Sequence, residues 1–129
     1  MASITGKVSP GAQHSGPTWG WMDQFLRQQM GWAAVETGTL NICLDDYRSY
    51  AHARRVDFLI PHCASPLAPW DCYFERCAID ANGKSVDAVI ATTGDNFWGK
   101  RNGTIEVRAS VKLRTTLSLI DGSIITVIV

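Results

Sequence analysis

The 129-residue chain has no excess of charge of either sign, because Lys plus Arg and Asp plus Glu number 12 each. Without a basic excess there is no electrostatic case for nucleic acid or an anionic membrane as the main partner. Long apolar runs are also missing, since "IITVIV" at 124–129 is too short to span a bilayer. The start, "MASITGKVSPGAQHSG", lacks the charged-then-apolar layout of a signal peptide. We therefore expect a cytoplasmic protein that binds neither nucleic acid nor membrane.

Paired cysteine motifs are missing as well. The four cysteines, at 43, 63, 72 and 77, show no CxxC spacing, so we expect free thiols in a reducing compartment rather than a disulfide framework. A zinc site built from His62, Cys63, Cys72 and Cys77 is an alternative, although this spacing matches no compact metal motif. Cys72 and Cys77 are five residues apart, which places them on opposite faces of a regular strand.

The length and the pattern of apolar residues predict one mainly β domain over residues 1–129. Asn82-Gly83 lies between two apolar runs and indicates a β-hairpin. Short strands joined by turns favour a barrel. The expected strands are 3–10, 38–44, 56–61, 71–80, 84–93, 104–110 and 124–129.

Two segments have helical character. The residues at 21, 22, 25, 26 and 30 are apolar at helical spacing, which predicts a helix over 21–30 that ends at Gly31. "VKLRTTL" at 111–117 predicts one or two helical turns, with Ser110 as the cap. We assign Leu113, Leu117 and Leu119 to the core. The polar stretch "YRSYAHARR" at 47–55, which contains His52, is expected to be an exposed loop or turn.

The stretch "ETGTLNICL" at 36–44 combines a strand pattern with an unusual polar pair. Leu40, Ile42 and Leu44 share one face of the expected strand, whereas Thr39 and Asn41 share the other. The polar pair also follows Gly38 directly. A solvent-facing strand edge would explain such a pair, and so would a binding site.

The order of motifs along the chain resembles that of the archaeal CTP-dependent riboflavin kinases. The motifs are "GKVSPG" near the start, "GTLNI" after a helix, Gly31 and Trp32, and the final "KLRTTLSLIDGSIITVIV". The resemblance covers nearly the whole chain, and its specific parts are "GTLN" and the C-terminal segment. It implies a six-stranded cradle-loop β-barrel with one main α-helix, about 21–30, and a short C-terminal helical turn.

The resemblance implies that Thr39 and Asn41 hold a Mg²⁺ ion that bridges the nucleotide phosphates and the acceptor. Hydroxyl and amide oxygens are hard ligands, and magnesium often has few protein ligands while phosphates and water complete its shell. Gly38 would let phosphate approach the backbone closely.

The resemblance places the nucleotide against two segments. The first is the loop of Gly11, Ala12, Gln13, His14, Ser15 and Gly16. This loop departs from the Gly-x-Gly-x-Gly pattern of the family, and Pro10 and Pro17 on its flanks each remove a donor. The second segment is Lys112, Leu113 and Arg114, whose two cations would meet a phosphate or order the loop that holds one.

Thr93, Trp98 and Glu106 are the expected flavin contacts. The Glu106 carboxylate would accept hydrogen bonds from the ribityl chain and serve as the candidate catalytic base. The alternative is an outward strand residue paired with Arg108 or another neighbour. Trp98 belongs to the loop 92–103, where an aromatic pair would cover the isoalloxazine ring or, alternatively, pack down on a hairpin excursion.

The favoured hypothesis is a phosphotransferase that moves the γ-phosphoryl group of CTP, or of another nucleoside triphosphate, to the 5′-hydroxyl of riboflavin and forms FMN. Its cofactor is Mg²⁺, and its partners are the two small-molecule substrates. The altered glycine loop motivates an alternative, a non-catalytic barrel of the same family that binds flavin or nucleotide. A third hypothesis is an unrelated small barrel that acts through protein contacts, with five tryptophans as anchors.

Overall fold

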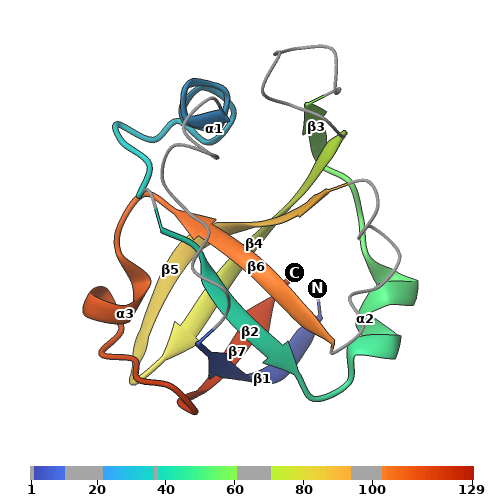
Figure 1. Ribbon diagram of the computed structural model, residues 1–129, viewed down its shortest axis with the longest axis vertical. Helices are drawn as coiled ribbons and strands as arrows, with labels where there is room; N and C mark the ends of the chain where they lie inside the picture. The colour runs from blue at the N-terminus through green and yellow to red at the C-terminus, as the bar shows by residue number, and fades with distance from the viewer. Residues whose placement is uncertain (1, 11–21, 37, 61–70, 94–102) are drawn as a thin grey trace.

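The computed structural model describes residues 2–10, 22–36, 38–60, 71–93 and 103–129, and their arrangement is shown in Figure 1. These residues form one antiparallel sheet of seven strands in the order β3-β4-β5-β6-β2-β1-β7, so the predicted mainly β class is confirmed. The strands are β1 (Ser3–Ser9), β2 (Leu40–Leu44), β3 (Phe58–Ile60), β4 (Cys72–Ala81), β5 (Lys84–Thr93), β6 (Thr104–Ala109) and β7 (Ile124–Ile128). The helices are α1 (Asp23–Met30), α2 (Tyr47–Ala53) and α3 (Leu113–Thr116).

Strand β7 pairs on both of its sides. It runs antiparallel to β1, with Thr5 opposite Thr126, and antiparallel to β4, with Ile79 opposite Val127. The succession of pairings β4-β5-β6-β2-β1-β7 therefore returns to β4. Among the described strands, only β3 has a single neighbour.

The predicted hairpin at Asn82-Gly83 joins β4 to β5. Both residues have positive φ, 52° and 78°, which is the combination that a tight two-residue turn between antiparallel strands requires. Ala81 pairs with Lys84 directly beside the turn, and the register continues to Cys72 opposite Thr93. The turn thus sets the alignment of the two longest strands.

One face of the sheet builds the larger hydrophobic cluster. Ile42, Ile79, Ile90, Val107 and Val127 are all fully buried in it. Leu113, Leu117 and Leu119 from the segment around α3 cover the same cluster, which confirms their assignment to the core. The C-terminal segment is therefore fastened to the sheet by its leucines.

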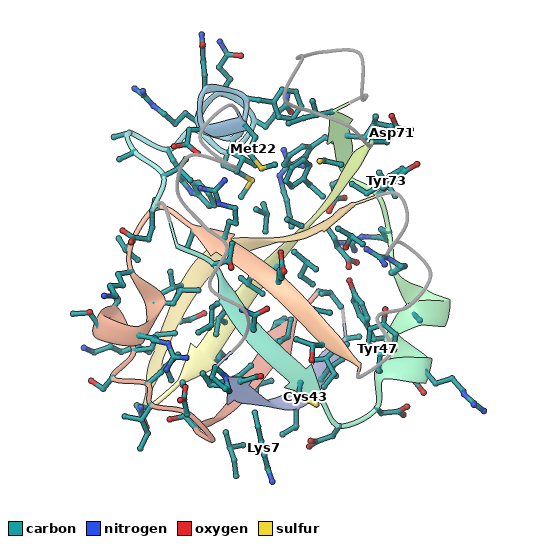
Figure 2. All side chains as sticks on the ribbon, viewed as in Figure 1. Lys7, Met22, Cys43, Tyr47, Asp71 and Tyr73 are labelled. Carbon is teal, nitrogen blue, oxygen red and sulfur yellow. The ribbon has the colours of Figure 1, made fainter. Side chains whose placement is uncertain are left out.

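A second cluster lies between α1 and the other face of β3, β4 and β5. Met22 and Leu26 have no exposed surface, and Figure 2 shows Met22 beneath the helix, on the side of the sheet. Phe25 contacts the Phe58 and Phe74 rings. The helix predicted over 21–30 is confirmed for Asp23–Met30, with Gly31 at φ 69° as its C-cap, and Trp21 lies outside the described residues.

The two described buried cysteines confirm the expected alternation along β4. Cys72 belongs to the cluster beneath α1, whereas Cys77 belongs to the larger cluster on the opposite face. Five residues of extended strand separate them, so their thiols cannot meet in one metal site.

Two predictions about local structure are wrong. The stretch expected as a loop at 47–55 contains α2, whose N-cap Asp46 accepts a hydrogen bond from the Ser49 N–H at 3.2 Å. Tyr50 is a buried hydrophobic residue of this helix, and its exposed fraction is 2%. Helix α3 begins after Lys112 and not after Ser110, because the Lys112 carbonyl accepts from the N–H groups of Thr115 and Thr116.

Candidate functional site

A cavity of about 330 Å³ opens where β1 ends, β2 begins and α3 follows β6. We call it the β1–β2 cavity. Its lining comes from three segments that are distant in sequence: Ser9, Pro10, Glu36, Gly38, Thr39, Leu40, Asn41, Val107, Ala109, Val111, Lys112, Leu113 and Arg114. The structure therefore brings the two predicted metal ligands and the predicted segment 112–114 to one site.

Strand register explains this convergence. Asn41 of β2 pairs with Ser9, the last residue of β1, and with Glu106 of β6. Leu40 pairs with Val107 one step further along. Because β1 ends where β2 starts, Ser9 and Pro10 meet the residues that precede β2 at this end of the sheet.

Asn41 is the most unusual polar residue of the cavity. Its side chain is buried at 9% exposure, and no hydrogen bond or ion pair from the described part of the chain engages it. The Asn41 amide atoms are not among the described atoms that are both fully buried and without a partner, so they are open to the solvent in the cavity. An unpaired amide that is open to a cavity is available to a ligand.

Thr39 lies two residues before Asn41, just outside β2, and is partly buried. Its hydroxyl also has no hydrogen-bond partner among the described residues. The cavity wall thus carries two uncommitted oxygen donors that follow one another along the chain.

Glu36 also lines the cavity, although no sequence motif marked it as a binding residue. Its N–H donates to the Ala109 carbonyl at 2.9 Å, and its carbonyl accepts from the Arg108 guanidinium at 2.9 Å. A Cβ added to Gly38 would lie 3.9 Å from the Glu36 carboxylate, so the carboxylate sits beside Gly38. The available signal was an acidic residue three positions before the "GTLN" threonine.

Two cations also line the cavity. Lys112 is exposed and precedes α3. Arg114 donates to the Asp121 carboxylate at 2.7 Å and to the Ser9 carbonyl at 3.4 Å. Arg114 therefore joins α3 to the Asp121-Gly122 turn and to the end of β1, which orders the rim of the cavity.

Arg108 holds the backbone of Glu36 in place at the cavity. It is 1% exposed and forms an ion pair with Asp23 at 3.1 Å, in the first turn of α1. Burial lowers the pKa of the Arg108 guanidinium, while the charges of Asp23 and Glu36 act in the opposite direction. The same guanidinium holds the Glu36 carbonyl, so one side chain links α1 to the cavity wall.

Two of the predicted flavin contacts, Thr93 and Glu106, are not among the described residues that line the cavity. Glu106 lies opposite Asn41 in the ladder and therefore on the same face of the sheet, and it is partly buried. The Thr93 backbone pairs with Cys72 at the end of β5. Trp98 lies outside the described residues, as do the loop residues 11–16 of the predicted nucleotide site.

A separate polar network lies beneath α2. The Tyr50 hydroxyl donates to the buried Glu75 carboxylate at 2.9 Å, and the Arg55 N–H donates to its other oxygen at 3.1 Å. Arg54 lies over the Tyr50 ring and donates to the Thr92 hydroxyl at 2.8 Å. Burial raises the pKa of the Tyr50 phenol. These contacts fasten α2 to β4 and β5.

Comparison with known proteins leaves the family open. No model of a known protein family matches the chain, and no curated protein matches it in sequence. In the described part of the chain, no three His, Cys, Asp or Glu residues gather into a metal-binding group, and His62 and Cys63 of the zinc alternative lie outside it. No described helix has the length and apolar character needed to cross a membrane.

Proposed function

We propose that this protein is a Mg²⁺-dependent riboflavin kinase that transfers the γ-phosphoryl group of CTP, or of another nucleoside triphosphate, to riboflavin. We further propose that β1, β2 and β4–β7 form the six-stranded cradle-loop barrel of such enzymes. The return of the strand pairings to β4 supports this architecture. The motif order along the chain supports the activity.

The observation that carries the proposal is the composition of the β1–β2 cavity. Thr39 and Asn41 were selected from one motif, and Lys112, Leu113 and Arg114 from another that lies some 70 positions later in the sequence. All five line the same cavity. Oxygen donors and cations that line one cavity are the groups that a metal–nucleotide complex needs.

The donor set fits magnesium. Asn41 supplies an amide and Thr39 a hydroxyl, and neither has a hydrogen-bond partner among the described residues. These two side chains would hold the ion. When bound, Mg²⁺ neutralises phosphate charge and orients the transferring group.

The chain's own residues supply positioning. Lys112 and the Arg114–Asp121 pair border the cavity where phosphates would lie. In the transfer, the 5′-hydroxyl oxygen of riboflavin bonds to the γ-phosphorus while the bond to the β–γ bridging oxygen breaks. The nucleoside diphosphate leaves, and the hydroxyl proton passes to Glu106 or to water. Phosphoryl transfer depends mostly on positioning and electrostatics, so the contribution of Glu106 as a base is expected to be small.

FMN formation tests the proposal. Purified protein is supplied with riboflavin and Mg²⁺ and with CTP or ATP in parallel, and FMN is separated by chromatography. We expect FMN from the wild type and a loss of about 100-fold in kcat/KM, roughly 2.7 kcal/mol, for the Thr39→Ala, Asn41→Ala double variant. Asp87→Asn, at an exposed position on β5, is the matched control and should keep full activity.

Folded protein that forms no FMN with either nucleotide would contradict the kinase. A bound yellow chromophore without turnover would then favour the non-catalytic flavin-binding barrel. Absence of both flavin and nucleotide binding would favour the barrel that acts through protein contacts.

A further inference from the structure

Glu36 has the properties of a cation ligand that no motif assigned. It lines the β1–β2 cavity together with Thr39 and Asn41. No hydrogen bond or ion pair from the residues that the structure describes engages its carboxylate. We propose that Glu36 is a third protein ligand of the divalent cation and gives the cavity affinity for that cation before any nucleotide binds. This inference rests on the proposed metal position at Thr39 and Asn41.

The backbone of Glu36 is held from both sides. Its N–H donates to Ala109 of β6, and its carbonyl accepts from Arg108 of the same strand. The carboxylate lies beside Gly38, which directly precedes Thr39. A side chain whose backbone is fixed loses less conformational entropy on binding, so the ligand is preorganised.

Arg108 and Arg114 have carboxylate partners of their own. Arg114, one of the two cations that line the cavity, is paired with Asp121 at 2.7 Å. Arg108 forms its ion pair with Asp23, which influences its pKa more strongly than Glu36 does. Glu36 is therefore not required as the main counter-charge of either arginine.

The chemistry of the three donors selects the class of ion. A carboxylate, an amide oxygen and a hydroxyl are hard oxygen donors, which suit Mg²⁺ and Mn²⁺ rather than thiophilic metals. With one carboxylate and several positions left for water or phosphate, the ion is expected to bind weakly in the free protein, with Kd of roughly millimolar order. Phosphate oxygens then complete the shell when the nucleotide arrives.

Direct Mn²⁺ binding tests the proposal without any turnover. The full chain is titrated with Mn²⁺ in the absence of nucleotide, and free Mn²⁺ is followed by its electron paramagnetic resonance signal. We expect one Mn²⁺ site, from which Mg²⁺ displaces the bound Mn²⁺. Glu36→Gln is expected to raise the Kd for Mn²⁺ roughly tenfold or more. Glutamine preserves the shape and both backbone hydrogen bonds of Glu36. Asp87→Asn removes an exposed carboxylate from β5 and should bind like the wild type.

A structural role of Glu36 would give a different pattern. Glu36→Gln would then lower the midpoint of thermal unfolding and leave Mn²⁺ binding unchanged, which would overturn the proposal. FMN formation by a wild type that binds no Mn²⁺ without nucleotide would also overturn it, while leaving the kinase intact. Nucleotide-independent Mn²⁺ binding that Glu36→Gln abolishes, in a protein that makes no FMN, would support the ligand and contradict the kinase.

Discussion

Cys72 and Cys77 are both buried, but on opposite faces of β4. Burial raises the pKa of the Cys72 thiol to about 11 and also raises that of Cys77. Cys43, by contrast, is exposed. Since the thiolate is the nucleophile, the position of each cysteine in the fold determines how fast it reacts.

We predict that Cys72 is alkylated by iodoacetamide at pH 8 at least about 100-fold more slowly than Cys43. The rise in the pKa of Cys72 from 9.0 to about 11 lowers its own thiolate fraction at pH 8 by about 100-fold, and its burial also restricts access of the reagent, whereas Cys43 is exposed. Mass spectrometry of time points from the native protein gives the two rates. In denaturant the rates should converge, and equal rates in the native protein would contradict the burial of Cys72.

The same shift predicts the direction of a stability change with pH. The folded pKa of Cys72 lies above the unfolded value, so the folded chain holds a proton that the unfolded chain releases. The free energy of unfolding should therefore fall as the pH rises from about 9 to about 11. Denaturant titrations across this range, compared with Cys72→Ala, isolate the contribution of this thiol.

Helix α1 shows how an element is held by one packed face and one ion pair. Met22 and Leu26 bury its apolar side, and burying such a side chain fully contributes about 1.5–3 kcal/mol. The Asp23 carboxylate, in the first turn of this helix, accepts a hydrogen bond from the Arg108 guanidinium. The helix is thereby joined to β6, whose next residue, Ala109, accepts the Glu36 N–H at the cavity wall.

We predict that Arg108→Met lowers the free energy of unfolding by roughly 2–4 kcal/mol. The substitution keeps most of the buried volume but leaves the Asp23 carboxylate and the Glu36 carbonyl without the donors of Arg108. Urea denaturation provides the measurement. Arg48→Met, at an exposed position on α2, is the control and should change stability by no more than about 0.5 kcal/mol. Equal stability of the two variants would show that the ion pair does not anchor α1.

Helices α1 and α2 differ in how well the amino-acid sequence predicts them. Helix α1 has apolar residues at helical spacing and a glycine stop, so it was predictable. Helix α2 is mostly polar, and its buried contact rests on Tyr50, which Glu75 engages from a distant strand. Among the described side chains of α2, only two aromatic residues, Tyr47 and Tyr50, pack on the larger cluster, so no apolar stripe along the sequence marks the helix.

In the whole molecule, β7 differs from β3 in the number of its neighbours. β7 is paired with β1 and with β4, whereas β3 is paired with β4 alone among the described strands. The backbone of β7 from Thr126 to Ile128 is therefore covered on both edges, and that of β3 on one.

We predict that the amides of Thr126, Val127 and Ile128 in β7 exchange with deuterium at rates close to those of β2, and much more slowly than those of β3. Residue-resolved hydrogen exchange at neutral pH provides the measurement, and β2 is the control because it is flanked by β1 and β6. Exchange of β7 as fast as that of β3 would show that the β4–β7 pairing does not persist in solution.

The sequence by itself determined what local chemistry can determine. Apolar alternation located the strands, Asn82-Gly83 set the hairpin, and the spacing of Met22 and Leu26 defined the buried face of α1. Thr39 and Asn41 also stood out, because a polar pair after a glycine interrupts an apolar strand. Each of these signals acts over a few residues, which is the range over which backbone geometry relates neighbours.

Only the tertiary structure decided which of the candidate residues meet. The register of β1 and β6 against β2 brings segment 112–114 beside Thr39 and Asn41 and adds Glu36, which no motif marked. The same register places Glu106 next to Asn41 in the ladder but outside the cavity lining. Such contacts depend on pairings between residues far apart in the chain, and the free energy of those pairings comes from the whole packed sheet.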